Sequence, residues 1–226
     1  MKKIFLASGL IILVFTLSAC TNIVNNENNN NVLENNNETS DKMSWEDANI
    51  NNGDYIVDAG LSEINWKGER IIGSSHAGKL RIKSGEFSID DEKINSGTIV
   101  FDMQSIADNE NNQRLITHLK SDDFFSVETY PEATLTIKES SLKTAEENRA
   151  VFDVVADLEI KGIVNEINFE AILEPKNNFL SVYTKTEIDR TRWNVRYGSG
   201  KFFDNLGDNT IKDAIELEVN LISSLQ

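Results

Sequence analysis

The sequence predicts a mainly β protein, a single antiparallel barrel of about eight strands with one short helical plug segment. After residue 52, apolar residues alternate with polar ones through most of the chain, which is the period of strands that bury one face. Helical spacing is confined to residues 109–125. The links between the alternating runs have hairpin length, which is typical of an antiparallel barrel or sandwich. A barrel is favoured because closure removes the exposed edges of a sheet.

Each strand is predicted from its own alternating run. In one of them Ile99, Phe101 and Met103 share a face, and turns are expected at Gly60, at Ser84–Gly85 and at Gly162. The predicted strands cover residues 55–59, 62–66, 79–82, 87–89, 97–103, 133–138, 152–160, 163–173, 180–188 and 215–221. No internal repeat and no second domain is evident.

The plug segment precedes the strand that begins at residue 133. Leu115 and Leu119 are spaced i,i+4, so a short helix should end near residue 120. Ser121, followed by two aspartates, has the composition of a new helix start, and this turn would carry Phe124 and Phe125. Two interpretations stay open. The segment is a plug that closes one end of the β-structure, or it borders a cavity.

The first residues predict where the protein is sent. Lys2 and Lys3 precede an apolar run that is too short to span a membrane comfortably, so residues 1–19 are interpreted as a secretory signal peptide. The stretch ending in Cys20, Leu-Ser-Ala-Cys, resembles the bacterial lipobox, which implies cleavage before Cys20 and a diacylglycerol on its sulfur. The alternative is an ordinary signal peptide with an incidental cysteine. Cys20 is the only cysteine, which excludes an intramolecular disulfide.

A spacer is predicted to follow the lipid. Residues 20–52 are rich in asparagine and poor in apolar residues, so they are interpreted as the lipidated cysteine and a flexible tether, with Trp45 marking where order begins. Thr21 is not the aspartate that often retains lipoproteins in the inner membrane. We therefore expect a lipid-anchored protein of the cell envelope, at the outer membrane, facing the periplasm or the cell surface.

Size and charge set further bounds. Residues 53–226 are enough for one domain with a sizeable core. The chain carries −15, and loss of Lys2 and Lys3 with the signal leaves 20 basic against 37 acidic residues, or −17. Such a charge argues against nucleic-acid binding and against docking on anionic headgroups. The sequence leaves the oligomeric state open, a homodimer included.

Five segments, in order, resemble the YceI-like family. They are His76-Ala77-Gly78, Phe101–Ile106, His118–Phe125 with the Tyr-Pro that follows, Leu158–Ile163, and Ile188–Val195. The resemblance covers the whole predicted domain. It implies a lipocalin-like barrel with an elongated apolar pocket that takes a polyisoprenoid or isoprenoid-quinone chain. One position departs from the family, because Lys161 stands where many relatives have histidine.

The predicted function is that of an exported, lipid-anchored binding protein that holds such an isoprenoid-type ligand and is not an enzyme. No cofactor or metal is expected beyond the possible bound polyisoprenoid or quinone. The alternative is a surface-displayed structural or interaction lipoprotein with a solid core, and interior volume distinguishes the two. Each candidate ligand-binding residue lies on an apolar face or in the plug, and each has the alternative of being plain core. The candidates are Trp66, Ile99, Phe101, Phe124, Phe125, Leu135, Phe152, Val154, Phe169 and Trp193.

Few polar residues of the chain are candidates for catalysis or metal binding. His76 and His118 are the only histidines, and their separation does not fit the usual zinc-ligand spacings. No nucleophile-elbow pattern surrounds Ser105 or Ser121, which argues against a hydrolase. The two histidines are expected to fix loop geometry at the barrel mouth. Arg190 is expected to pair with a nearby aspartate, Asp102 or Asp189, or to contact a polar ligand head.

Overall fold

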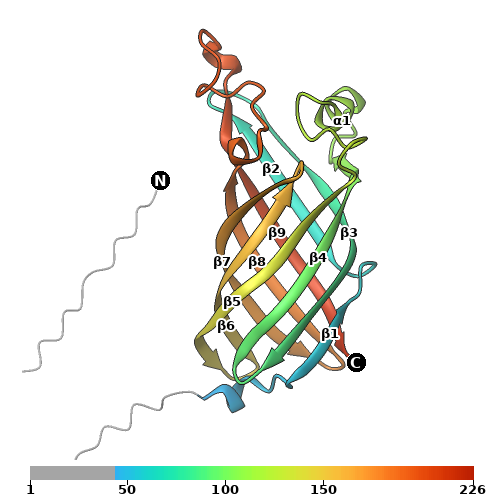
Figure 1. Ribbon diagram of the computed structural model, residues 1–226, viewed down its shortest axis with the longest axis vertical. Coiled ribbons are helices and arrows are strands. Elements are labelled where there is room, and N and C mark those ends of the chain that lie inside the picture. Colours follow the sequence, from blue (N-terminus) through green and yellow to red (C-terminus); the bar gives the residue numbers. More distant parts are fainter. Residues whose placement is uncertain (1–43) are drawn as a thin grey trace, which may run out of the picture. The chain divides into compact units, whose positions relative to one another are not determined.

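Eight strand positions close into an antiparallel barrel in the computed structural model, which describes residues 44–226 (Figure 1). The strands are β1 (Gly53–Val57), β2 (Glu63–Arg70), β3 (Ser75–Asp90), β4 (Lys93–Asp108), β5 (Glu132–Glu146), β6 (Arg149–Ile160), β7 (Ile163–Lys176), β8 (Phe179–Asp189) and β9 (Ile211–Leu225). Neighbours in the sheet follow the order β1-β3-β2-β9-β8-β7-β6-β5-β4, and pairing of β3 with β4 closes the ring. The predicted fold is confirmed.

Strands β1 and β2 share one position in this ring. Both run antiparallel to β3 and to β9, with β1 pairing at one end of these strands and β2 at the other. The turn at Gly60 therefore does not reverse the chain, and β2 continues in the direction of β1. This is why nine strands make a barrel of eight positions.

The predicted turn at Ser84–Gly85 is wrong. Strand β3 passes through it without a break, and the pairing with β4 shifts register between Ile82 and Ser84. A bulge of this kind interrupts the alternation of faces, which in sequence has the same signature as a turn. A side chain at Gly85 would meet Ile99 and Val57 at about 2.8 to 2.9 Å, so the glycine serves close packing of strands.

The predicted helix start at Ser121 is also wrong. A single helix, α1 (Gln113–Lys120), is capped by Asn112, whose side chain accepts the N–H of Leu115. Ser121 ends this helix instead, because its hydroxyl donates to the carbonyl of His118 at 2.7 Å. The residues after it form turns that lead into β5.

One end of the barrel is closed by a short 3-10 helix, η1 (Trp45–Ala48), which lies opposite α1 (Figure 1). Ala48 is fully buried, Ile50 is 6% exposed, and the Trp45 ring meets Phe152 edge-on at 6.0 Å between centroids. The packed core thus extends upstream of Gly53, where we expected the domain to begin. We call this part of the molecule the closed end.

Residues 41–226 form one compact unit, and it contains every described strand and all three hydrophobic core clusters. None of the helices in residues 44–226 is long and apolar enough to cross a membrane. The predicted signal peptide over residues 1–19, the lipidation of Cys20 and most of the predicted tether lie outside the described residues and stay predictions.

Candidate functional site

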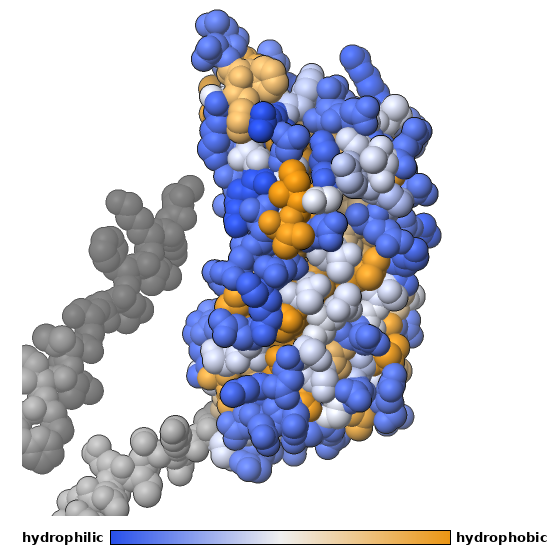
Figure 2. Space-filling view, in the orientation of Figure 1, coloured by the Kyte–Doolittle hydropathy of each residue, from blue (hydrophilic) through white to orange (hydrophobic). Residues whose placement is uncertain are grey.

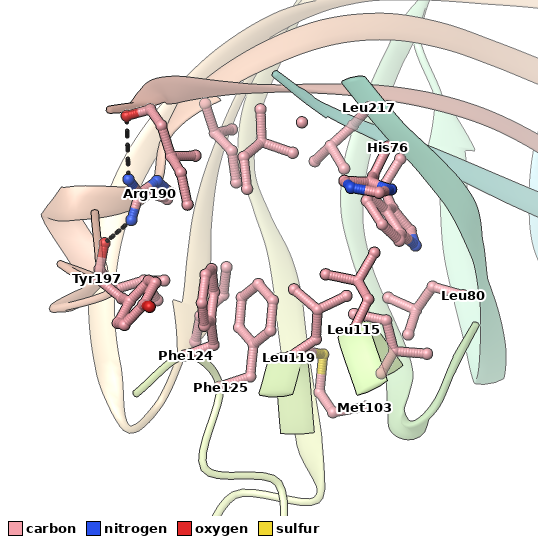
Figure 3. A pocket seen from close by; sticks show the side chains of 18 of the residues that line it. His76, Leu80, Met103, Leu115, Leu119, Phe124, Phe125, Arg190, Tyr197 and Leu217 are labelled. Atoms are coloured by element: carbon pink, nitrogen blue, oxygen red, sulfur yellow. Dashed lines mark hydrogen bonds between the residues drawn. The ribbon is translucent and has the colours of Figure 1, made fainter. Parts of the chain in front are cut away.

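A cavity of about 510 Å³ occupies the end of the barrel opposite the closed end (Figure 3). Its wall is mostly apolar, with Leu80, Met103, Leu119 and Leu217 among the side chains that converge on it. Its volume falls within the roughly 300–1,000 Å³ of ordinary small-molecule sites. We call the end at which it opens the mouth.

Half of the predicted ligand-binding residues line this cavity. These are Trp66, Phe101, Phe124, Phe125 and Trp193.

The other five do not line the cavity. They are Ile99, Leu135, Phe152, Val154 and Phe169. They belong to, or pack against, the cluster that fills the closed end. Phe152 is fully buried there and Val154 is 2% exposed. The barrel interior is therefore solid at the closed end and hollow at the mouth.

Many wall residues of the cavity were not among the predicted ligand-binding residues. They come from the half of the barrel nearer the mouth: Ile64, Leu80, Met103, Ile106, Ala133, Leu158, Ile160, Ile188, Ile211, Ile215, Leu217 and Val219. Their distance in sequence from the plug segment and from the strand ends near it would have identified them. Residues just before and just after the plug segment lie at the same end of an antiparallel barrel as the plug itself.

The plug segment forms one side of the cavity. Leu115 and Leu119 of α1 face it, and so do Phe124 and Phe125 from the turns that follow. The two open interpretations of this segment therefore both hold in part, because it covers the mouth end and borders a cavity.

Aromatic rings join the plug segment to the loop after β8. The His118 ring meets Phe124 edge-on at 5.0 Å and Tyr197 at 4.4 Å between centroids. Its Nε2 lies 3.2 Å from a carboxylate oxygen of Asp123. These contacts agree with the expected role of His118 in fixing loop geometry.

Trp66 enters the wall through a close approach of two strands. Its indole N–H donates to the carbonyl of Ala107 at 3.1 Å. A side chain at Gly78 would lie 1.8 Å from that same carbonyl oxygen and 2.7 Å from the Trp66 ring. Only glycine fits at this crossing, which gives a physical reason for the glycine in His76-Ala77-Gly78.

A second 3-10 helix, η2 (Arg190–Trp193), holds a buried cation against the wall. The Arg190 guanidinium donates to the carbonyls of Val195 at 2.7 Å, Lys212 at 3.2 Å and Ile211 at 3.3 Å. Burial lowers the pKa of Arg190, and Asp213 opposes this effect from 3.7 Å. The expected pairing with Asp102 or Asp189 is wrong.

Those two aspartates have other partners. Asp102 pairs with Arg81 at 3.1 Å, whereas Asp189 accepts from Thr191 and from Lys201.

Trp193 completes this side of the cavity. It is fully buried, and its indole N–H donates to the carbonyl of Leu158 at 2.8 Å. This bond fixes a large ring between η2 and β6, so the ring forms a rigid part of the wall.

Lys161, the residue that departs from the family pattern, lies at the turn between β6 and β7 with φ 53°. Its ammonium is 3.5 Å from the carbonyl oxygen of Asp122, so it reaches the plug segment. Burial lowers the pKa of Lys161, while Asp122 and Asp123 act in the opposite direction. Lys161 thus makes a polar link between the barrel and the plug segment.

The other histidine lies in the cavity wall. The Nδ1 of His76 is 3.7 Å from Oδ1 of Asp108, a carboxylate that is almost fully buried. The second oxygen of Asp108 accepts the backbone N–H groups of Glu110 and Asn112. Among residues 44–226 no group of three potential metal ligands is found.

An ion-pair chain lies on the rim of the mouth. Glu69 of β2 binds Lys67 and also Lys212 of β9, the latter at 2.6 Å. Hydrogen bonds from Lys212 and then Lys67 lower the pKa of Glu69 from its ordinary 4.5 to about 2. Because the folded pKa is depressed, any stabilisation is fully present above pH 4.5 and is lost as the pH falls through 2.

We expect Lys212→Ala to raise the pKa of Glu69, since it removes the largest cause of the depression. A carboxyl-carbon NMR titration would measure this pKa. Lys138→Ala is the control, because Lys138 pairs with Asp157 and Glu166 on other strands and should leave the pKa of Glu69 unchanged. An unchanged pKa in Lys212→Ala would show that Lys67 alone holds the carboxylate.

Comparisons with known proteins agree with this architecture. The YceI-like domain family model matches residues 55–222. A UPF0312 protein of Vibrio parahaemolyticus is 28% identical over 120 residues, which are 52% of this chain and 61% of that protein. One of Vibrio campbellii is 27% identical over 123 residues, 54% of this chain and 63% of that protein. The chain therefore spans about three fifths of the length of these relatives.

Solved structures show the same fold. A polyisoprenoid binding domain from Saccharophagus degradans, implicated in plant cell wall breakdown, has a TM-score of 0.57 at 18% identity and covers 76% of this chain and 98% of that one. BcnA of Burkholderia cenocepacia has a TM-score of 0.54 at 20% identity and covers 74% and 98%. With the family model matched over nearly the whole barrel, this protein belongs to the YceI-like domain family.

Proposed function

We propose that this protein is an exported, lipid-anchored binding protein that holds an isoprenoid-type molecule, a polyisoprenoid or an isoprenoid quinone, and carries out no chemistry on it. The observation that carries the proposal is the apolar cavity of about 510 Å³ at the mouth end of the barrel. Each ligand CH₂ that leaves water for such a wall contributes roughly 0.8 kcal/mol before the costs of association. The polyisoprenoid binding domain of Saccharophagus degradans, which shares the fold, supports the ligand class.

The orientation of the ligand follows from the two different ends. The closed end is filled by core and covered by η1, so an apolar chain enters through the mouth with its tail inward. The head group then lies near the polar wall residues His76, Arg114 and His118. These groups donate hydrogen bonds to a carbonyl or hydroxyl head and need not react with it.

The alternative of a solid-core interaction protein has support only at the closed end. There the interior matches it, because Phe152, Leu173 and Ile89 are all fully buried. At the mouth end Trp193 is also fully buried, but a cavity of about 510 Å³ remains between the apolar side chains of the wall.

The test is to identify what the barrel carries. Residues 41–226, exported and purified without detergent, would be extracted with organic solvent and examined by mass spectrometry for polyprenyl species. A stoichiometric isoprenoid is the expected result. If the extract is empty, a prenylated quinone would be added and its binding followed by quenching of Trp66 and Trp193, which lie in the wall. No binding in both assays would overturn the proposal.

A further inference from the structure

Two loops at the mouth expose large apolar side chains. Ile71 and Ile72 are 60% and 61% exposed, and Phe202 and Phe203 are 44% and 48% exposed. We call these four residues the mouth tip. The loops that carry them are joined, because the N–H of Ile71 donates to the carbonyl of Thr210 at 2.9 Å. Figure 2 shows an apolar patch at the outer end of the segment that Figure 1 colours orange-red, with hydrophilic residues around it.

Local charge at the mouth tip differs from that of the whole chain. No acidic residue occurs in residues 70–85 or in residues 190–203, although the chain carries −15. The Arg196 guanidinium lies 4.5 Å from the centre of the Phe202 ring, and Arg70 extends toward Asn209. Asp204 and Asp208 follow on the same loop.

This arrangement has the chemistry of a membrane interface. Arginine and lysine stems lie along apolar surface while their charged ends stay among headgroups, and phenylalanine and isoleucine enter the acyl boundary. A second copy of the chain is a poorer occupant, because it would bring Arg70 and Arg196 toward the same cations across the contact.

The mouth tip is continuous with the cavity. Arg70 and Ser74, which flank the exposed isoleucines, belong to the cavity wall, as does Tyr197, five residues before Phe202. An isoprenoid that left a membrane elsewhere would expose its chain to water on the way to the mouth, at a cost that grows with every methylene. Contact of these loops with the bilayer would remove that step.

A membrane contact at the mouth would add to the predicted lipid anchor at Cys20. The first described element of the chain, η1, lies at the closed end, opposite the mouth (Figure 1). A lipid on Cys20 would therefore not by itself bring the mouth to the bilayer. The roughly 24 residues between Cys20 and Ser44 can span up to about 80 Å when extended, longer than a tilted 16-residue strand at roughly 40 Å, so the barrel can turn its mouth to the same membrane.

We propose that the mouth tip inserts Ile71, Ile72, Phe202 and Phe203 into the surface of a lipid bilayer, so that the cavity opens onto the membrane that supplies its ligand. Docking on the bilayer does not depend on which ligand the barrel binds. That the membrane supplies the ligand rests on the proposed function.

The experiment uses residues 41–226, which form one compact unit and contain every described strand and core cluster. This fragment would be floated with phosphatidylcholine vesicles, with and without phosphatidylglycerol, that contain no isoprenoid. Two variants alter the mouth tip: Ile71→Ser with Ile72→Ser, and Phe202→Ser with Phe203→Ser. We expect each to lower the vesicle-bound partition coefficient at least tenfold.

Matched controls lie away from the mouth. Leu61→Ser removes a side chain that is 58% exposed, and Phe179→Ser removes one that is 44% exposed. Both should leave the partition coefficient within twofold of the unsubstituted fragment. Equal losses in the controls, no loss in the mouth-tip variants, or no vesicle binding by the unsubstituted fragment would overturn the proposal. Self-association that the same serines abolish, without vesicle binding, would assign the mouth tip to a second copy.

A second readout separates docking from ligand binding. The mouth-tip variants should bind a water-soluble short-chain quinone with unchanged affinity, measured by fluorescence of Trp66 and Trp193, because none of the four residues lines the cavity. Their uptake of a long-chain quinone from vesicles should slow at least tenfold. If the unsubstituted fragment docks on vesicles but binds no quinone, the proposed function fails and the docking stands.

Discussion

Ala133→Leu is expected to weaken binding of a prenylated quinone roughly fiftyfold, because three added carbons displace about three ligand carbons worth ~0.8 kcal/mol each. Ala133 is 3% exposed and lines the cavity from the start of β5. The leucine would occupy space that is free in the unliganded barrel. The free energy of unfolding without ligand should therefore stay the same or rise.

Ala171→Leu is the matched control. Ala171 is also 3% exposed, but it belongs to the cluster that fills the closed end. The same three carbons would there enter a packed core, which costs about 1–3 kcal/mol of the free energy of unfolding. Ligand affinity, measured by quenching of Trp66 and Trp193, should change little.

The two variants together distinguish a barrel with a ligand cavity at the mouth from a barrel with a solid core. Urea unfolding gives the stability of each variant, and a quinone titration gives its affinity. If Ala133→Leu destabilised the unliganded barrel as much as Ala171→Leu does, the mouth end would be as tightly packed as the closed end. The binding proposal would then lose the observation that carries it.

The fold could be predicted because strand periodicity reports burial directly. Runs such as Ile99, Phe101 and Met103 alternate in step with the pleat, and the structure places them in one continuous strand. The predicted turn at Ser84–Gly85 failed because a bulge and a turn both interrupt the alternation. Periodicity also cannot show that β1 and β2 share one position in the barrel, since that depends on which strands they pair with.

The site could be predicted only in part, for a related reason. The alternation of apolar and polar residues shows which side chains face the barrel interior. How far a side chain lies from the mouth depends on the register of all eight strand positions, which the alternation does not show. Phe101 and Phe152 both face inward, yet Phe101 meets the cavity and Phe152 meets Trp45 at the closed end. The aromatic residues of the plug were placed correctly because the plug itself marks one end. Arg190 was misjudged because its main partners are backbone carbonyls, which no side-chain pattern reveals.

Removal of the residues before Gly53, including η1, is expected to lower the stability of the barrel. We expect the free energy of unfolding of a fragment that begins at Gly53 to be lower than that of residues 41–226, by at most about 4 kcal/mol. Burial of a side chain such as Ile50 contributes roughly 1.5–3 kcal/mol, and an aromatic pair such as Trp45 with Phe152 adds roughly 0.5–1.5 kcal/mol, before part is offset by the entropy of ordering η1. Urea unfolding followed by tryptophan fluorescence measures the difference.

A point substitution shows whether this loss comes from docking of η1. Ala48 is fully buried, so Ala48→Asp would place an unpaired carboxylate in the core unless η1 detaches. Detachment limits the cost, so Ala48→Asp in residues 41–226 should lose as much as the truncation and no more. Glu46→Gln, on the exposed side of the same turn, should stay within about 0.5 kcal/mol of the unsubstituted fragment. A fragment from Gly53 as stable as the longer one would mean that the closed end is sealed by the strands alone, and that η1 only rests on it.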